Sequence, residues 1–409
     1  MRPIWIRTAL FNFLIAAVMG AVMRFAFVQA IPGLHFKAFL HGHSHGAMLG
    51  WIYLALYSLM IPAFLKEADQ KKPIYAWVFW TTQVTVLGMF VSFPIQGYGP
   101  VSIFFSTLHI LLSYLFAGQF LRDLRGVKGY SAGFIRLALF WMVVSTLGVW
   151  AMGPLMGSSF RGSAWYYLSV QFFLHFQFNG WFLFGALALF FRWLENRGIE
   201  LDASRQQHFR SLLIASTILT FALAVAWSNP HPAVFALNSM GVLIQLAALW
   251  VLRKTVVPAL KAIRGQVEPW TFGLWRLALL SFIGKVLIQA AVVVPAVAKM
   301  AYTIRNFVIG FVHLIMLGVL SMFIFAYLDQ EAKSWFSGKA TRLGISVFVV
   351  GVALSEALLF LQGTLFWLRM GFLPHYYLLL FAFSALMPVG VGVVWVGAVR
   401  RLGVWAFRG

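Results

Sequence analysis

Long apolar runs are the feature that most constrains this sequence. Along its 409 residues, 12 stretches of roughly 20 or more mostly apolar residues follow one another, each long enough to cross the ~30 Å hydrocarbon core of a bilayer. Only 10% of the residues are charged, whereas a soluble domain carries about 25%. The sequence therefore predicts an all-α polytopic membrane protein and excludes an ordinary water-soluble enzyme.

We expect 12 transmembrane helices within a single transmembrane domain that covers residues 1–409. The first span follows a short basic stretch, as a signal peptide would, but we expect it to be kept as an anchor. The predicted spans are 5–30, 41–65, 75–97, 99–121, 133–157, 165–192, 209–228, 233–252, 270–298, 302–328, 342–366 and 374–399.

Basic residues are distributed unequally between the two sets of connections. Of the 31 Lys and Arg residues, 23 lie in one set or near the termini, and 5 lie in the opposite set. Because positively charged loops stay in the cytoplasm, both termini are predicted to be cytoplasmic. The net charge of +21 thus indicates membrane topology, and we expect no nucleic-acid partner. The predicted location is a bacterial inner (plasma) membrane, with the lipid bilayer as the first partner.

Histidine is the natural candidate for metal chemistry, because the chain contains no cysteine. A single buried histidine is usually a structural hydrogen-bonding residue. Seven of the 10 histidines, however, fall in the predicted outer half of the membrane or at its edge, which favours a site for haem iron or copper. These seven are His41, His43, His45, His109, His175, His231 and His313.

The start of the second span carries three of these histidines at alternate positions. Helical spacing places His41 and His45 on one face and points His43 away from both. A polar, partly hydrated helix start is the alternative explanation for His41 and His43. We expect His45 to be a ligand, since the small Gly46 and Gly50 would let a flat macrocycle or a neighbouring backbone approach closely.

Two ionisable residues lie deep in predicted spans. Glu356, in the eleventh span, is the one carboxylate well inside the membrane. Lys285, in the ninth, lies at comparable depth and could neutralise it, although a buried pair of this kind is often only structural.

Together these residues resemble the haem–copper oxidase subunit I superfamily, most of all its nitric oxide reductase branch. The resemblance covers the 12-span architecture and four short stretches. His45, followed by glycine, and His313, in His-Leu-Ile-Met-Leu-Gly, resemble the two opposite ligands of the family's low-spin haem. His175, in His-Phe-Gln-Phe-Asn-Gly-Trp, resembles the histidine that holds the non-haem metal, and His231 falls where the family carries a His-His pair.

Other positions match or depart from that family. Arg369 matches the region where arginines pair with haem propionates. Phe311 stands where the ligand of the high-spin haem would be, Pro232 follows the single remaining histidine of the pair, and Asn179 replaces the reductases' glutamate. The resemblance implies a retained low-spin haem and a degenerate binuclear site.

The leading hypothesis is a haem-binding integral membrane redox protein that transfers electrons, or reacts with or senses a diatomic gas such as oxygen or nitric oxide. Its b-type haem would be bound by His45 and His313, with Gly46 and Arg369 beside it. Copper or non-haem iron would occupy a second site, with a cytochrome subunit or quinol as electron donor. The candidate ligands of that second metal are His175, His231, His41, His43 and His109.

Other functions stay open at this point. If the protein is an enzyme, it is an oxidoreductase of the cytochrome oxidase or nitric oxide reductase type, and its catalytic residues are not identified. The first alternative is a copper transport or insertion protein that captures copper with His41, His43 and His45 and passes it to Met48 or Met60. The second is an accessory subunit that kept the fold and lost every cofactor.

Overall fold

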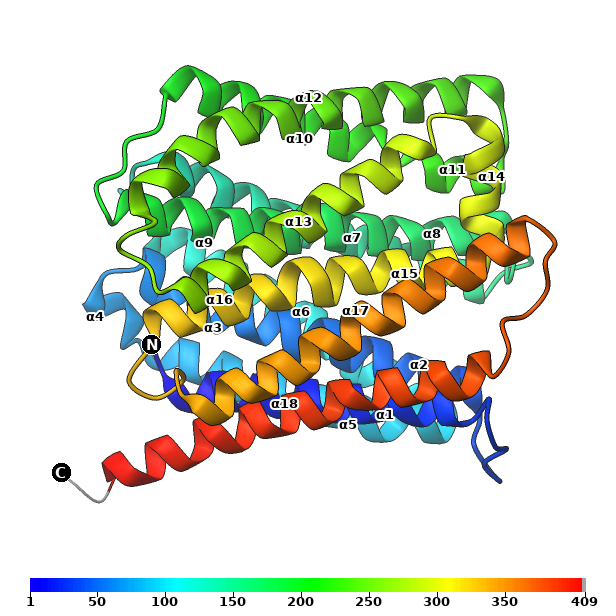
Figure 1. The fold of residues 1–409 in the computed structure, drawn as a ribbon, viewed down its shortest axis with the longest axis horizontal. Coiled ribbons are helices and arrows are strands. Elements are labelled where there is room, and N and C mark those ends of the chain that lie inside the picture. Colours follow the sequence, from blue (N-terminus) through cyan, green and yellow to red (C-terminus); the bar gives the residue numbers. More distant parts are fainter. Residues whose placement is uncertain (407–409) are drawn as a thin grey trace. The chain divides into compact units, whose positions relative to one another are not determined.

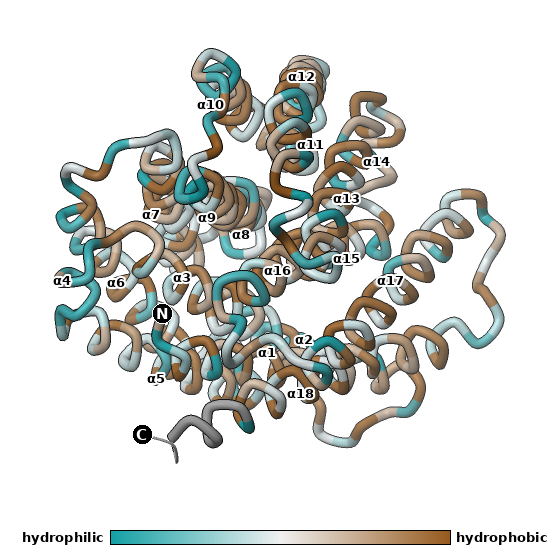
Figure 2. The backbone as a smooth tube through the Cα atoms, turned by 60° about the vertical axis from the view of Figure 1, so that its left-hand side comes forward, coloured by the Kyte–Doolittle hydropathy of each residue, from teal (hydrophilic) through white to brown (hydrophobic). Residues whose placement is uncertain are grey.

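The computed structural model describes residues 1–406, and every regular element in that range is a helix. Twelve helical stretches are long and apolar enough to cross a membrane, which confirms the predicted all-α, multi-pass architecture. Figure 2 shows apolar residues along most of each helix and polar residues at connections such as α4 (Glu67–Gln70). The 12 stretches are Pro3–Phe25, Phe36–Phe64, Pro73–Gln96, Pro100–Asp123, Tyr130–Met156, Ala164–Glu195, Ala203–Ser228, Pro232–Ile263, Pro269–Ala291, Arg305–Glu331, Lys339–Trp367 and Tyr376–Arg400.

The chain divides into two compact units, each of which is described by itself. The first contains Met1–Asp123 and Met316–Gly409, and the second contains Leu124–Ile315. The single domain predicted for residues 1–409 and the cytoplasmic location of both termini stay predictions.

The first unit is built from helices at both ends of the chain. Within it α17 and α18 pack along each other, as Figure 1 shows in orange and red, and α18 also packs on α1. Further contacts join α2 to α5 and α5 to α6. Its elements are α1 (Pro3–Phe25), α2 (Phe36–His45), η1 (Gly46–Tyr53), α3 (Leu54–Phe64), α4, α5 (Pro73–Gln96), α6 (Pro100–Asp123), α16 (Met322–Glu331), α17 (Lys339–Trp367) and α18 (Tyr376–Ala406).

Aromatic stacking organises the interior of this unit. The Phe13 ring stacks on Trp51 with centroids 4.7 Å apart, and the Trp5 ring stacks on Phe79 at 4.6 Å. All four side chains are at most 3% exposed. Such offset ring pairs add to the stabilisation from burial alone, so they tie α1 firmly to η1 and α5.

The second unit is a continuous stretch of the chain. Here α10 and α12 run side by side (Figure 1), α7 packs against α8 and α9, and α12 contacts α13. Its elements are α7 (Tyr130–Met156), α8 (Ala164–His175), η2 (Phe176–Phe182), α9 (Leu183–Glu195), α10 (Ala203–Leu219), α11 (Ala222–Ser228), α12 (Pro232–Ile263), α13 (Pro269–Ala291), α14 (Pro295–Thr303) and α15 (Arg305–His313). A third π-helical segment, η3 (Leu314–Ser321), contains the division between the units.

Proline sets several helix boundaries. Six helices, including α5, α12 and α13, begin at a proline, which has no N–H to lose at the first helical position. The predicted span 270–298 was too long: α13 ends at Ala291 and the separate helix α14 begins at Pro295. A residue before proline is disfavoured in the helical conformation, and here that residue, Val294, follows two further valines.

A cluster of charged side chains joins the start of α5 to the end of α6. The Lys72 ammonium lies 2.5 Å from an Asp123 carboxylate oxygen and 2.7 Å from Asp69, and the Tyr75 hydroxyl donates to Asp123 at 2.7 Å. Hydrogen bonds to both carboxylates raise the pKa of Lys72 above its ordinary value.

Candidate functional site

Three candidate histidines share an unusual backbone setting. His45, His175 and His313 are each the last residue of an α-helix that continues directly as a π-helical segment. These segments are η1, η2 and η3, of 8, 7 and 8 residues. π-Helices are rare, appear mostly as short bulges inside α-helices, and occur frequently at functional sites.

A short sequence pattern accompanies this geometry. Each of the three histidines is followed five residues later by a glycine: Gly50, Gly180 and Gly318. A Cβ added to Gly50 would lie 2.8 Å from Val86, and one added to Gly180 would lie 2.6 Å from the Trp141 side chain. Glycine therefore allows the widened π turns to approach neighbouring helices closely. The same His-x4-Gly spacing joins His41 to Gly46, where α2 continues as an α-helix, so this spacing alone does not indicate a π segment.

The His45 ring is held by a backbone carbonyl one turn before it. Its Nδ1 lies 2.9 Å from the His41 backbone oxygen. Because a carbonyl can only accept, Nδ1 carries the proton and Nε2 keeps its lone pair. Ligating histidines commonly donate their other ring N–H to a carbonyl or carboxylate in this way. The ring packs on Phe93 and Tyr98, with centroids 4.3 and 6.1 Å away.

The other two histidines of α2 lie on different sides of the helix, as the helical spacing predicts. His41 packs against the same Tyr98 ring, at 4.6 Å. The His43 Nδ1 instead lies 2.8 Å from the Ala16 backbone oxygen on α1. His41 and His45 thus share a side, while His43 joins α2 to α1.

Gly46 lies against an aromatic ring of α5. A Cβ at this position would lie 2.0 Å from Cε1 of Phe90, far inside van der Waals contact. The space that a side chain would occupy is therefore filled by Phe90. A role for Gly46 beside a cofactor stays a prediction.

His109, on α6, is a second imidazole with an available nitrogen in the first unit. It is 2% exposed, its ring lies 4.8 Å from the Tyr53 ring, and it hydrogen-bonds to the Leu49 backbone inside η1. Its Nε2 has no hydrogen-bond partner within residues 1–406. His45 acts on it electrostatically, so the two rings are neighbours.

His175 has a different arrangement in the second unit. Its Nε2 lies 2.8 Å from the Thr217 backbone oxygen and carries the proton. Its Nδ1 therefore keeps the lone pair and lies 3.5 Å from the Asn179 side-chain nitrogen. Asn179, at the position where the resemblance expects a glutamate, orients the ring of the histidine one turn before it.

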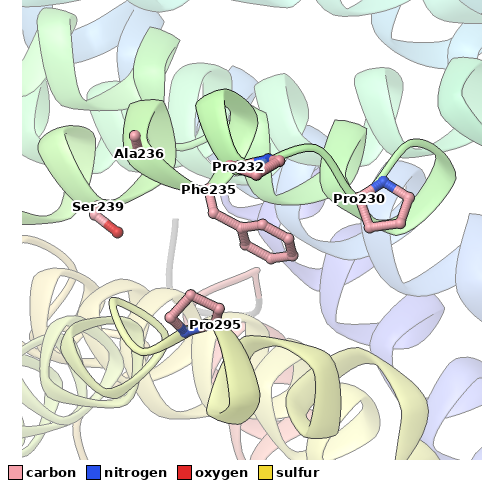
Figure 3. Close-up of a pocket in the computed structure, with 6 residues that line it drawn as sticks. All are labelled: Pro230, Pro232, Phe235, Ala236, Ser239 and Pro295. Carbon is pink, nitrogen blue, oxygen red and sulfur yellow. The ribbon is translucent and has the colours of Figure 1, made fainter.

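His231 lies at the start of α12, beside a pocket. It is exposed, and its Nδ1 accepts a hydrogen bond of 3.2 Å from the Ala233 backbone, capping the helix. The adjacent pocket has a volume of about 400 Å³. Figure 3 shows the Phe235 ring between the start of α12 and Pro295. Its lining residues are Pro230, Pro232, Phe235, Ala236, Ser239 and Pro295, which carry no titratable side chain.

The remaining candidates lie at helix ends. His313 ends α15 in the second unit, two residues before the division of the span Arg305–Glu331. Arg369 is exposed just after α17, where its φ of 59° places it in the left-handed region and its N–H bonds to the Phe366 oxygen. Its pairing with a propionate stays a prediction.

The described residues, 1–406, contain no group of three or more His, Cys, Asp or Glu side chains placed to hold a metal ion. Within the first unit, the charged side chain that acts on Glu356 is Arg24. Lys285 belongs to the second unit, so its predicted pairing with Glu356 stays a prediction.

Comparisons with known proteins do not assign this sequence to a family. The sequence matches no protein-family model and no curated protein. The assignment that stands is a 12-helix, multi-pass membrane protein.

Proposed function

We propose that the protein is a haem-binding membrane redox protein in which His45 and His313 would hold a b-type haem. The observation that carries the proposal is the π-helical segment that follows His45, His175 and His313. Each of the three segments directly follows a histidine that the family resemblance singles out, and π-helices occur frequently at functional sites.

The ring geometry of His45 supports a ligand role. The bond from Nδ1 to the His41 carbonyl fixes the tautomer and the plane of the ring, and Phe93 holds the ring from one side. The residue is thus prepared to offer Nε2 without a change of rotamer. When bound, a haem held by two histidines would supply one-electron redox chemistry.

A second metal site is the less supported part of the proposal. His175 would offer Nδ1 to copper or non-haem iron, since its Nε2 is committed to Thr217. His231 would be a further ligand, and a cytochrome subunit or quinol would be the electron donor. Arg369 would pair with the haem propionates.

Optical spectra of the purified protein and its variants test the proposal. We expect a low-spin haem spectrum that responds to reduction, and its loss in His45→Ala and in His313→Ala. The matched control is His208→Ala, which removes an exposed histidine from α10 and should leave the spectrum unchanged.

Three results would contradict the proposal. One is a colourless, iron-free preparation; another is a haem signal that survives in both ligand variants. Copper in the absence of haem would favour the copper-transport alternative, which now depends on His41 and His45, since His43 points to α1.

A further inference from the structure

A second set of buried polar side chains lies in the second unit. Gln245 on α12, and Lys285 and Gln289 on α13, are 4%, 2% and 7% exposed. Within residues 1–406, the Lys285 Nζ and the side-chain oxygens of the two glutamines have no hydrogen-bond partner. An unsatisfied buried polar group costs about 1–3 kcal/mol, and a charged group costs more. Three such groups on two contacting helices indicate a binding site for a polar ligand.

Two hydrogen bonds fix the register between α12 and α13. The Asn238 side-chain nitrogen donates to the Val292 oxygen at 3.3 Å, and the Ser239 hydroxyl donates to the Val293 oxygen at 3.1 Å. Moving seven residues along each antiparallel helix, about 10 Å, leads from Asn238 to Gln245 and from Val292 to Lys285. Gln245 and Lys285 therefore lie at one depth, with Gln289 one turn away on the Lys285 face.

A second register links α12 to α10. A Cβ at Gly241 would lie 2.9 Å from the Thr220 backbone nitrogen, which places these residues opposite each other. Four residues further along the antiparallel pair, Gln245 is level with Ser216 and Thr217. Thr217 is the residue whose carbonyl accepts from His175, so Gln245 and His175 share that depth.

Electrostatics provides an independent third link. The Lys285 ammonium acts on the His175 imidazole, although the two residues come from α13 and α8. Lys285, Gln245 and His175 thus converge from three helices.

No carboxylate of the second unit lies at that depth. Its acidic residues are Glu195, Glu200, Asp202 and Glu268. Glu268 precedes α13 and lies 17 residues, about 25 Å, from Lys285. Glu195 ends α9, about 30 Å along the helix from His175. The other two lie in the connection that follows α9.

We propose that Gln245, Lys285 and Gln289, here called the Lys285 centre, bind a small monovalent inorganic anion. The protonated Lys285 amine supplies the positive charge, and each carboxamide can turn to present its NH₂ group. Low-dielectric surroundings strengthen the attraction between the ammonium and an anion. The apolar cluster of Val242 and Val292 nearby favours a small ion over a bulky one. The inference does not depend on haem binding.

Calorimetric titration of the full-length protein in neutral detergent with sodium bromide and sodium nitrate tests this site. We expect saturable binding by the wild type, binding at least about tenfold weaker in Lys285→Met, and retained binding in Lys285→Arg. Gln245→Leu should weaken binding less. The control is Lys299→Met, which removes an exposed lysine of the same unit and should bind as the wild type does.

The fold of the key variant can be checked separately. Replacing an unpaired buried cation by an apolar side chain removes a desolvation cost, so Lys285→Met should melt no lower than the wild type in anion-free buffer. If it does not fold, Lys285→Arg and Gln245→Leu carry the test. Absence of saturable binding in the wild type, or equal binding by Lys285→Met, would overturn the inference.

Discussion

Two buried carboxamides connect three elements of the first unit and allow a quantitative prediction. The Asn12 side-chain nitrogen donates to the Gly50 backbone oxygen at 3.1 Å and to the Gln83 side-chain oxygen at 2.7 Å. Gln83 returns a bond of 3.0 Å to the Asn12 side-chain oxygen. Since Gly50 lies in η1, Asn12 supplies a donor to a backbone carbonyl of the π segment that follows His45.

The expected energies follow from this geometry. Interhelical side-chain hydrogen bonds in membranes average about 0.6 kcal/mol, with a maximum near 1.7. Asn12→Leu removes three bonds and should cost about 2 kcal/mol, whereas Gln83→Leu removes two and should cost about 1 kcal/mol. Each single variant loses both hydrogen bonds between Asn12 and Gln83. The double variant should therefore cost little more than Asn12→Leu alone, which corresponds to a coupling energy of about 1 kcal/mol between the two substitutions.

Unfolding in increasing mole fractions of dodecyl sulfate, followed by circular dichroism, would give these free energies. The control is Thr81→Val, at a threonine whose hydroxyl bonds only to Trp77 in its own helix. Strict additivity of the two leucine variants, or an unchanged stability of Asn12→Leu, would refute the reasoning.

Three further outcomes are expected in melting experiments. Gly46→Ala should destabilise by about 1–3 kcal/mol through overlap with Phe90, and Phe90→Leu in the same chain should restore part of the loss. Hydrogen bonds to Asp123 and Asp69 raise the pKa of Lys72, so the difference in melting temperature between wild type and Lys72→Met should be full from neutral pH to pH 10.5 and disappear above the raised pKa. Trp51→Phe should lose the 2.9 Å bond to the Ser321 hydroxyl, worth about 0.6–1.7 kcal/mol. Ser321→Ala should therefore cost less in the Trp51→Phe chain than in the wild type by about that amount, since its own bond to the Met316 oxygen is lost in both.

Apolar length alone was enough to predict the number of spans, because each run had to cover the same hydrocarbon thickness. The limits of α13 were harder to predict, since Val292 to Val294 are as apolar as the helix before them. Pro295 disfavours the helical conformation at Val294 and begins α14. Five other helices of the described residues continue through a proline, so a proline in the sequence does not by itself place the end of α13 at Ala291.

Some features of the candidate site follow from local sequence, whereas others depend on how the helices pack. The separation of His43 from His41 and His45 follows from helical periodicity, so the sequence was sufficient. The contact of His43 with Ala16 depends on how α1 packs, which no local pattern encodes. The π segments were also missed, because a wider turn buries the same apolar residues.

The Lys285 centre required the structure for a different reason. The sequence places the charged Lys285 deep within a predicted span and indicates Glu356 as its partner. Gln245 and Gln289 carried no signal of their own in sequence, because single polar residues in apolar helices are common. The hydrogen bonds from Asn238 and Ser239 fix the register of α12 and α13, and only this register shows that Gln245 lies at the same depth as Lys285.

If the histidines that precede the π-helical segments bind haem, the purified protein will contain it. The most direct test is the haem and iron content of the purified wild-type protein, measured by pyridine haemochrome and elemental analysis. We expect b-type haem in a fixed ratio to protein, with at least one iron atom for each haem. A folded preparation that contains neither would contradict this expectation.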